Sequence, residues 1–183
     1  DTFGKILPRA TEISSRISVI YLALTSVCAL AYAATGMQAF DALVHAMTTV
    51  ATGGFANYDS SFGQFSGATE YIAVVFMLLA ALPFVRFVQL TAGQAKPLFR
   101  DSQIHAFFAT AFVLVALLTL WNMSHSGPSE AGFRETLFNT VSLLTGTGYA
   151  SSDYMSWGGF PVTVLFFTGL IGGCAGSTAC SIK

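Results

Sequence analysis

The hydrophobic positions of this chain form four long runs separated by short polar segments. The runs cover approximately residues 17–37, 71–90, 104–123 and 160–181. Each approaches the roughly 20 apolar residues that a helix needs to cross a bilayer. Two shorter apolar stretches, residues 40–52 and 134–146, lie between the runs. Because about a dozen residues cannot cross a membrane, we predict two short helices that enter it and turn back.

The ends of the two short stretches repeat each other at a distance of 94 residues. The repeated segments are Thr52, Gly53, Gly54 and Phe55 in the first copy and Gly146, Thr147, Gly148 and Tyr149 in the second. The match extends back to Thr48 and Ser142. Such self-similarity indicates one structural unit that occurs twice. We expect a first unit over residues 1–92, a link over 93–103 and a second unit over 104–183.

The composition of the chain indicates a membrane protein. Hydrophobic residues make up 54% of the sequence and charged residues only 9%, whereas a soluble domain carries about 25% charged residues. The default solvent is therefore the lipid bilayer. No basic patch stands out, which argues against a nucleic-acid partner. The three cysteines have neither disulfide nor metal-site spacing.

All but one of the eight basic residues gather on one side of the predicted spans, and Arg134 is the exception. The others are Lys5, Arg9 and Arg16 before the first span, Arg86, Lys96 and Arg100 around the link, and Lys183 at the end. The positive-inside rule places this side in the cytoplasm. Both short helices then enter from outside, and the two units have the same orientation. Inverted-repeat transporters require opposite orientations.

The repeated segments have the chemistry of a cation filter. A cation that crosses a membrane exchanges its water for rings of backbone carbonyls, and glycine gives access to the backbone geometry that such rings need. We refer to residues 52–55 and 146–149 as the first and second filter segments. The preceding helices point their partially negative C-termini toward them, and Phe55 and Tyr149 are expected to pack behind them and fix their width. The alternative, simple glycine turns between helices, explains one copy more easily than two.

A glycine-rich segment interrupts the fourth span. It contains Gly172, Gly173, Cys174, Ala175, Gly176, Ser177 and Thr178, and we call residues 172–178 the glycine-rich loop. Each glycine costs a helix about 1 kcal/mol relative to alanine, so we expect the helix to unwind here and either bind ions or obstruct their path. Close helix packing through pairs such as Gly169 and Gly173 stays open as an alternative. The corresponding residues 76–82 lack glycine, so we expect only the fourth span to be broken.

With these motifs, the chain resembles the Trk/Ktr/HKT superfamily of potassium and sodium transporters, and its TrkH-like members most of all. The resemblance rests on residues 48–55, residues 142–149, and residues 172–178 followed by Ile182-Lys183. It implies an all-α, potassium-channel-like fold of four membrane-pore-membrane repeats around one pore, of which this chain looks like the second and third. Gly54 and Gly148 would be filter glycines, and the glycine-rich loop would be the intramembrane gating loop. One departure is that Ala179-Cys180-Ser181 stands where the family usually has more glycine.

The resemblance also implies a function and partners. We expect uptake of a monovalent cation, mainly potassium, across the inner membrane of a bacterium by a multi-pass protein, with potassium bound at the filter carbonyls and no cofactor. The expected partners are the first and fourth repeats, a second copy in a homodimer, a TrkA-like nucleotide-binding regulatory subunit in the cytoplasm, and the lipid bilayer. A sodium-permeable or sodium-coupled member of the superfamily is an alternative. An intramembrane enzyme is disfavoured because Ser177 has no well-placed histidine, and a secondary transporter because its usual pair of corresponding helix breaks is not predicted.

Overall fold

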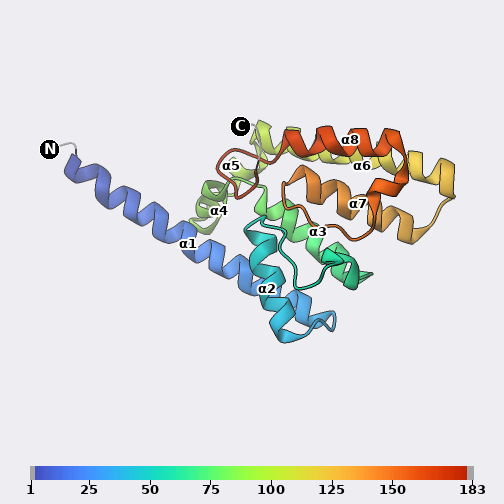
Figure 1. Ribbon diagram of the computed structural model, residues 1–183. Helices are drawn as coiled ribbons and strands as arrows, with labels where there is room; N and C mark the ends of the chain where they lie inside the picture. Colours follow the sequence, from blue (N-terminus) through green and yellow to red (C-terminus); the bar gives the residue numbers. More distant parts are fainter. Residues whose placement is uncertain (1–2, 181–183) are drawn as a thin grey trace.

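In the computed structural model of this chain, the backbone is described for residues 3–180 and the side chains for residues 11–180. Every regular element within residues 3–180 is helical (Figure 1), which confirms the predicted all-α membrane fold. The α-helices are α1 (Phe3–Ala34), α2 (Ala39–Val50), α3 (Ala68–Ala80), α4 (Phe84–Thr91), α5 (Lys96–Phe99), α6 (Ser102–Ser126), α7 (Glu130–Leu144) and α8 (Gly159–Ile171). Two 3-10 helices, η1 (Ser61–Gln64) and η2 (Tyr154–Trp157), follow the filter segments.

Among the residues that the structure describes, two single helices are long and apolar enough to cross a membrane. They are α6 and the Thr11–Ala34 part of α1. The start of α6 is fixed by Asp101, whose carboxylate accepts the backbone N–H of Gln103 at 3.0 Å, as a helix N-cap requires. The N-terminal part of α1 extends away from the other helices (Figure 1). The two re-entrant helices are α2 and α7, within a few residues of their predicted limits.

The second predicted span is not one straight helix. It consists of α3 and α4, which meet at an angle of 89° across residues 81–83. Pro83 lacks a backbone N–H and cannot continue the helix that precedes it. The expectation that only the fourth span is broken was therefore wrong, and so was the argument against a secondary transporter that used it.

The fourth span is helical over half of its predicted length. Helix α8 ends at Ile171, Gly172 has a φ of 75°, and residues 172–180 follow without helical structure. A Cβ added to Gly169 would meet no atom within 4 Å. The chain therefore unwinds where the glycines begin, and the Gly169/Gly173 pair does not bring two helices together.

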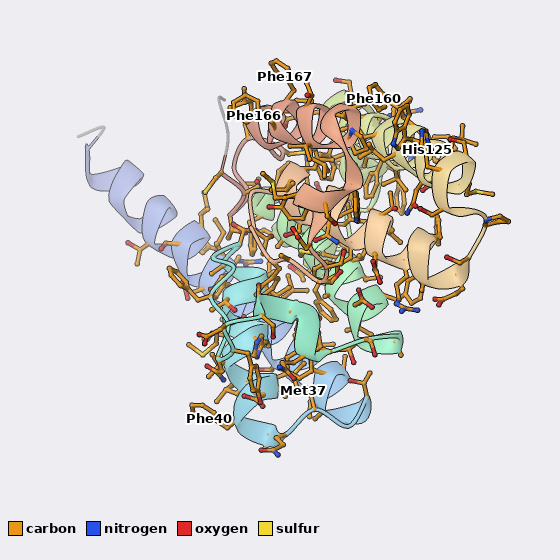
Figure 2. The ribbon with its side chains drawn as sticks, turned by 45° about the vertical axis from the view of Figure 1, so that its right-hand side comes forward. Met37, Phe40, His125, Phe160, Phe166 and Phe167 are labelled. Carbon is orange, nitrogen blue, oxygen red and sulfur yellow. The ribbon has the colours of Figure 1, made fainter. Side chains whose placement is uncertain are left out.

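The two units contribute residues to the same two clusters of buried hydrophobic side chains. Helix α3 of the first unit packs against α7 of the second, and α7 also contacts α6 and α8. The core at this junction includes fully buried Tyr32, Phe62, Phe138 and Tyr149. Figure 2 shows Phe40 on α2 and Phe166 and Phe167 on α8 pointing away from the molecule at well-separated places. Phe40 is 71% exposed and Phe166 is 66% exposed, so apolar surface remains on both units.

Candidate functional site

The two filter segments approach each other at the level of the backbone. Gly54 has a φ of 65°, and a Cβ added to it would lie 2.0 Å from the carbonyl oxygen of Thr147. No side chain fits in that space, because real Cβ atoms do not come within 3.0 Å of other heavy atoms. The two filter segments are therefore in direct backbone contact at Gly54 and Thr147.

The backbone of both filter segments alternates in handedness. Positive φ angles occur at Thr52 (49°) and Gly54 (65°) in the first segment and at Gly146 (71°) and Gly148 (85°) in the second. In a uniform strand, successive carbonyls point to opposite sides. A change of handedness at every second residue allows neighbouring carbonyls to face one side, as a cation filter needs. Thr52 lacks glycine's freedom, and its left-handed conformation costs about 1–2 kcal/mol.

A hydroxyl group in each re-entrant helix holds the end of its own filter segment. Thr48 Oγ1 donates to the carbonyl of Phe55 at 2.8 Å, and Ser142 Oγ donates to the carbonyl of Tyr149 at 2.7 Å. Thr48 and Ser142 are matched in the repeat. Sequence reasoning found that match without assigning it a role; two hydroxyls at equivalent positions were the available signal.

The two aromatic residues that end the filter segments lie in different surroundings. Tyr149 is fully buried, and its hydroxyl lies within hydrogen-bonding distance of the carbonyl of His45, at 3.0 Å. The same hydroxyl contacts the hydroxyls of Thr48 and Thr49. Phe55, by contrast, is 75% exposed. Tyr149 is thus packed against α2 and Phe55 is not, and the filter-support role of both residues stays a prediction.

The glycine-rich loop and the two residues after it run beneath both filter segments. Thr52 Oγ1 donates to the carbonyl of Thr178 at 2.7 Å, and Thr178 Oγ1 donates to the carbonyl of Val50 at 2.8 Å. A Cβ added to Gly146 would lie 2.9 Å from Cβ of Cys180. The chain thus passes from the base of the first segment at Thr178 to the base of the second at Cys180.

The break in the second span holds this loop in place. Backbone hydrogen bonds connect Cys174 N to Ala81 O (3.0 Å), Phe84 N to Gly176 O (3.0 Å) and Thr178 N to Ala80 O (3.3 Å). A broken helix leaves backbone groups without helical partners, and these must be satisfied away from water. Each break therefore supplies the partners that the other needs. In the sequence, only Pro83 hinted at the first break.

The loop is also braced within itself and bordered by a cavity. Ser177 Oγ donates to the carbonyl of Cys174 at 2.6 Å and accepts the N–H of Ala179 at 3.3 Å. A cavity of about 480 Å³ lies between α1 and the loop, lined by Tyr21 and Phe84 as well as by loop residues. The loop is thus ordered but has open space on one side.

Charged side chains near the start of α7 form a cluster of one arginine and two glutamates. Arg134 donates through Nε to Glu70 of α3 and through a second nitrogen to Glu130. Glu130 also accepts the hydroxyl of Tyr71 at 2.9 Å. This cluster ties the two units together on the side where both re-entrant helices begin and leaves no isolated positive charge at Arg134.

The comparisons with known proteins identify the family. A family model described as "TrkH: Cation transport protein" matches residues 2–183. The chain belongs to the TrkH family. The family and the relatives below are named for transport, so this TrkH-family chain is not assigned to an enzyme class.

Relatives of known name are similar over the whole TrkH-family chain. The Trk system potassium uptake protein TrkI of Halomonas elongata is 38% identical over 100% of this chain, and TrkH of Vibrio parahaemolyticus is 38% identical over 98%. The crystal structure of the potassium transporter TrkH from Vibrio parahaemolyticus matches with a TM-score of 0.87 and 35% identity over 94% of this chain. In each case the match covers 38% of the other chain, so this chain spans well under half of those proteins.

Proposed function

We propose that this chain forms two walls of a potassium-selective filter in a protein that takes up potassium across the inner membrane of a bacterium. The observation that carries the proposal is the contact between the filter segments, where Gly54 leaves no room for a Cβ beside the Thr147 carbonyl. The names of the relatives, Trk system potassium uptake proteins, point to the same ion.

The proposed chemistry uses the backbone and no reactive side chain. Carbonyls at residues 52–54 and 146–148 take the place of the water around the cation. Helices α2 and α7 end at Val50 and Leu144, directly before these segments. Their C-terminal ends carry partial negative charge, which stabilises a cation at the filter. Anions receive no such stabilisation.

The glycine-rich loop is proposed to be the gate. It lies beneath both filter segments, so an ion that leaves the filter toward the α4–α5 side meets it. Moving it requires the loss of the backbone hydrogen bonds to Ala80, Ala81 and Phe84, each worth about 0.5–1.5 kcal/mol net. A regulatory subunit of the TrkA type, bound on the proposed cytoplasmic side, is the proposed source of that energy.

Two filter segments cannot form a closed ring of carbonyls, and two observations support the presence of open sides on these segments, which other repeats would cover. A Cβ added to Gly148 would meet nothing within 4 Å, whereas its equivalent Gly54 faces the next filter segment. Phe55 is exposed where its equivalent Tyr149 is buried. We propose that a first and a fourth repeat cover these sides, and that the complete protein forms a homodimer.

The filter assignment is tested by Gly54→Ser in the full-length protein. The positive φ and the close Thr147 carbonyl oppose any side chain at this position, so the carbonyls must shift. We expect a large drop in the ratio of potassium to sodium permeability, measured from ion fluxes in liposomes. An unchanged ratio in correctly folded protein would show that Gly54 does not line the filter.

A further inference from the structure

The hydroxyl group of Thr48 is bonded to both filter segments. It donates to the carbonyl of Phe55 at 2.8 Å, at the end of the first segment. It also makes a short hydrogen bond with the hydroxyl of Tyr149, at the end of the second. A hydroxyl carries one proton, so a Thr48 that donates to Phe55 accepts from Tyr149, and Tyr149 then donates to Thr48 instead of to the carbonyl of His45. A chain of hydrogen bonds then runs from the second segment through Thr48 to the first.

The surroundings of Tyr149 restrict where its hydroxyl can go. The ring is fully buried, with the ring centroid of Phe62 at 5.0 Å and that of His45 at 6.2 Å. The alternative partners at the same end of the side chain are the carbonyl of His45 at 3.0 Å and the hydroxyl of Thr49 at 3.3 Å. The hydrogen-bond partners of this hydroxyl, on His45, Thr48 and Thr49, all belong to α2 of the other unit. In so apolar a setting a hydroxyl that loses its partners is costly, so Tyr149 stays attached to α2.

The equivalent residue in the second unit, Ser142, bonds within its own unit. Ser142 Oγ donates to the carbonyl of Tyr149 at 2.7 Å, and the hydrogen bonds found for this hydroxyl among residues 11–180 include no aromatic side chain. In the second unit the hydroxyl thus bonds the end of its own filter segment. In the first unit the hydroxyl of Thr48 makes the same bond and also bonds Tyr149 of the other unit. Thr48 and Tyr149 are the two residues that make this link.

We propose that Thr48 and Tyr149 are positioning residues for ion selectivity, because their hydrogen bond sets the separation of the two filter segments. The proposal rests on the proposed filter function. Whether selectivity comes from cavity size or from the field of flexible carbonyls, the backbone must be held against thermal motion. Residues 52–54 and 146–148 contain four glycines, which contribute no side chain for packing. The bond between Thr48 and Tyr149 provides that support from behind.

The test measures the ratio of potassium to sodium permeability of the full-length protein in liposomes. Tyr149→Phe removes the hydroxyl and keeps the ring, and Thr48→Val removes the other hydroxyl and keeps the shape. We expect each to lower the ratio about 3- to 10-fold, the equivalent of one hydrogen bond. Thr48→Ser retains a hydroxyl and should keep a ratio close to wild type. The double variant should lower the ratio by less than the product of the two single effects, because the bond that Thr48 and Tyr149 share is lost only once.

The control is Thr25→Val, since the partner of the buried Thr25 hydroxyl among residues 11–180 is the carbonyl of Tyr21 in its own helix, at 2.8 Å. We expect it to leave the ratio unchanged. Gly54→Ser is measured in parallel to separate this proposal from the filter assignment. If Gly54→Ser lowers the ratio and Tyr149→Phe and Thr48→Val do not, the positioning role is refuted and the filter stands. A loss of thermal stability with an unchanged ratio refutes it as well, because the bond would then be purely structural.

Discussion

Thr178 attaches the glycine-rich loop to the first unit, and removing its hydroxyl should weaken the gate. Thr178→Val keeps the shape of the side chain but removes the bonds from Oγ1 to the carbonyls of Val50 (2.8 Å) and Ala80 (3.1 Å). One proton is shared between two acceptors, so we count a single hydrogen bond of about 1 kcal/mol. If this bond exists only while the loop lies beneath the filter, the open population rises about 5-fold.

Rubidium uptake into liposomes that contain the full-length protein, without any regulatory subunit, measures this population. We expect Thr178→Val to raise the basal flux about 5-fold. Thr168→Val is the matched control, because the partner of the buried Thr168 hydroxyl among residues 11–180 is the carbonyl of Val164 in its own helix, at 2.8 Å. Flux at the wild-type level in a folded Thr178→Val protein would refute the reasoning, since the loop would then either not be held by Thr178 or not block the path.

Two further predictions concern the side of the molecule where α4 and α5 lie. A small charged thiol reagent applied from that side should modify Cys180, which is exposed, and not Cys28 or Cys174, which are buried; labelling that survives Cys180→Ser would contradict the position of the loop. Arg86 Nε donates to Asp101 at 2.8 Å and so ties α4 to the start of α6. This hydrogen bond holds the pKa of Asp101 below its usual value. The pair therefore adds stability above the ordinary carboxyl pKa of about 4 and loses it as the pH falls through the lower folded value. Asp101→Asn should lower the melting temperature at pH 7 and leave it nearly unchanged well below pH 4, and an equal loss at both would argue against the pair.

The parts of the site that the sequence predicts are those that depend on local geometry. The glycines of the two filter segments were expected to leave helical geometry, and Gly54, Gly146 and Gly148 have positive φ angles. The positive φ of Thr52 was not predicted, because threonine lacks the conformational freedom of glycine. The run of glycines after Ile171 anticipates the end of α8 in the same way.

The parts that the sequence does not predict depend on contacts between the two units. The break in the second span contains no glycine, and its backbone groups are stable there because the glycine-rich loop bonds Ala80, Ala81 and Phe84. Neither segment by itself indicates that its backbone groups find their hydrogen-bond partners in the other. Likewise, Phe55 and Tyr149 are equivalent in the repeat, yet Tyr149 is buried against α2 of the other unit whereas Phe55 is exposed. The repeat alone does not reveal this difference.

The central claim is that the backbone of the two filter segments binds the transported ion. The most direct test is anomalous X-ray scattering from crystals of the full-length protein grown with rubidium in place of potassium. We predict a rubidium peak among the carbonyl oxygens of residues 52–54 and 146–148, and none of comparable height at the side-chain carboxylates. Rubidium bound only at carboxylates such as Asp41, with no peak between the filter segments, would contradict the account.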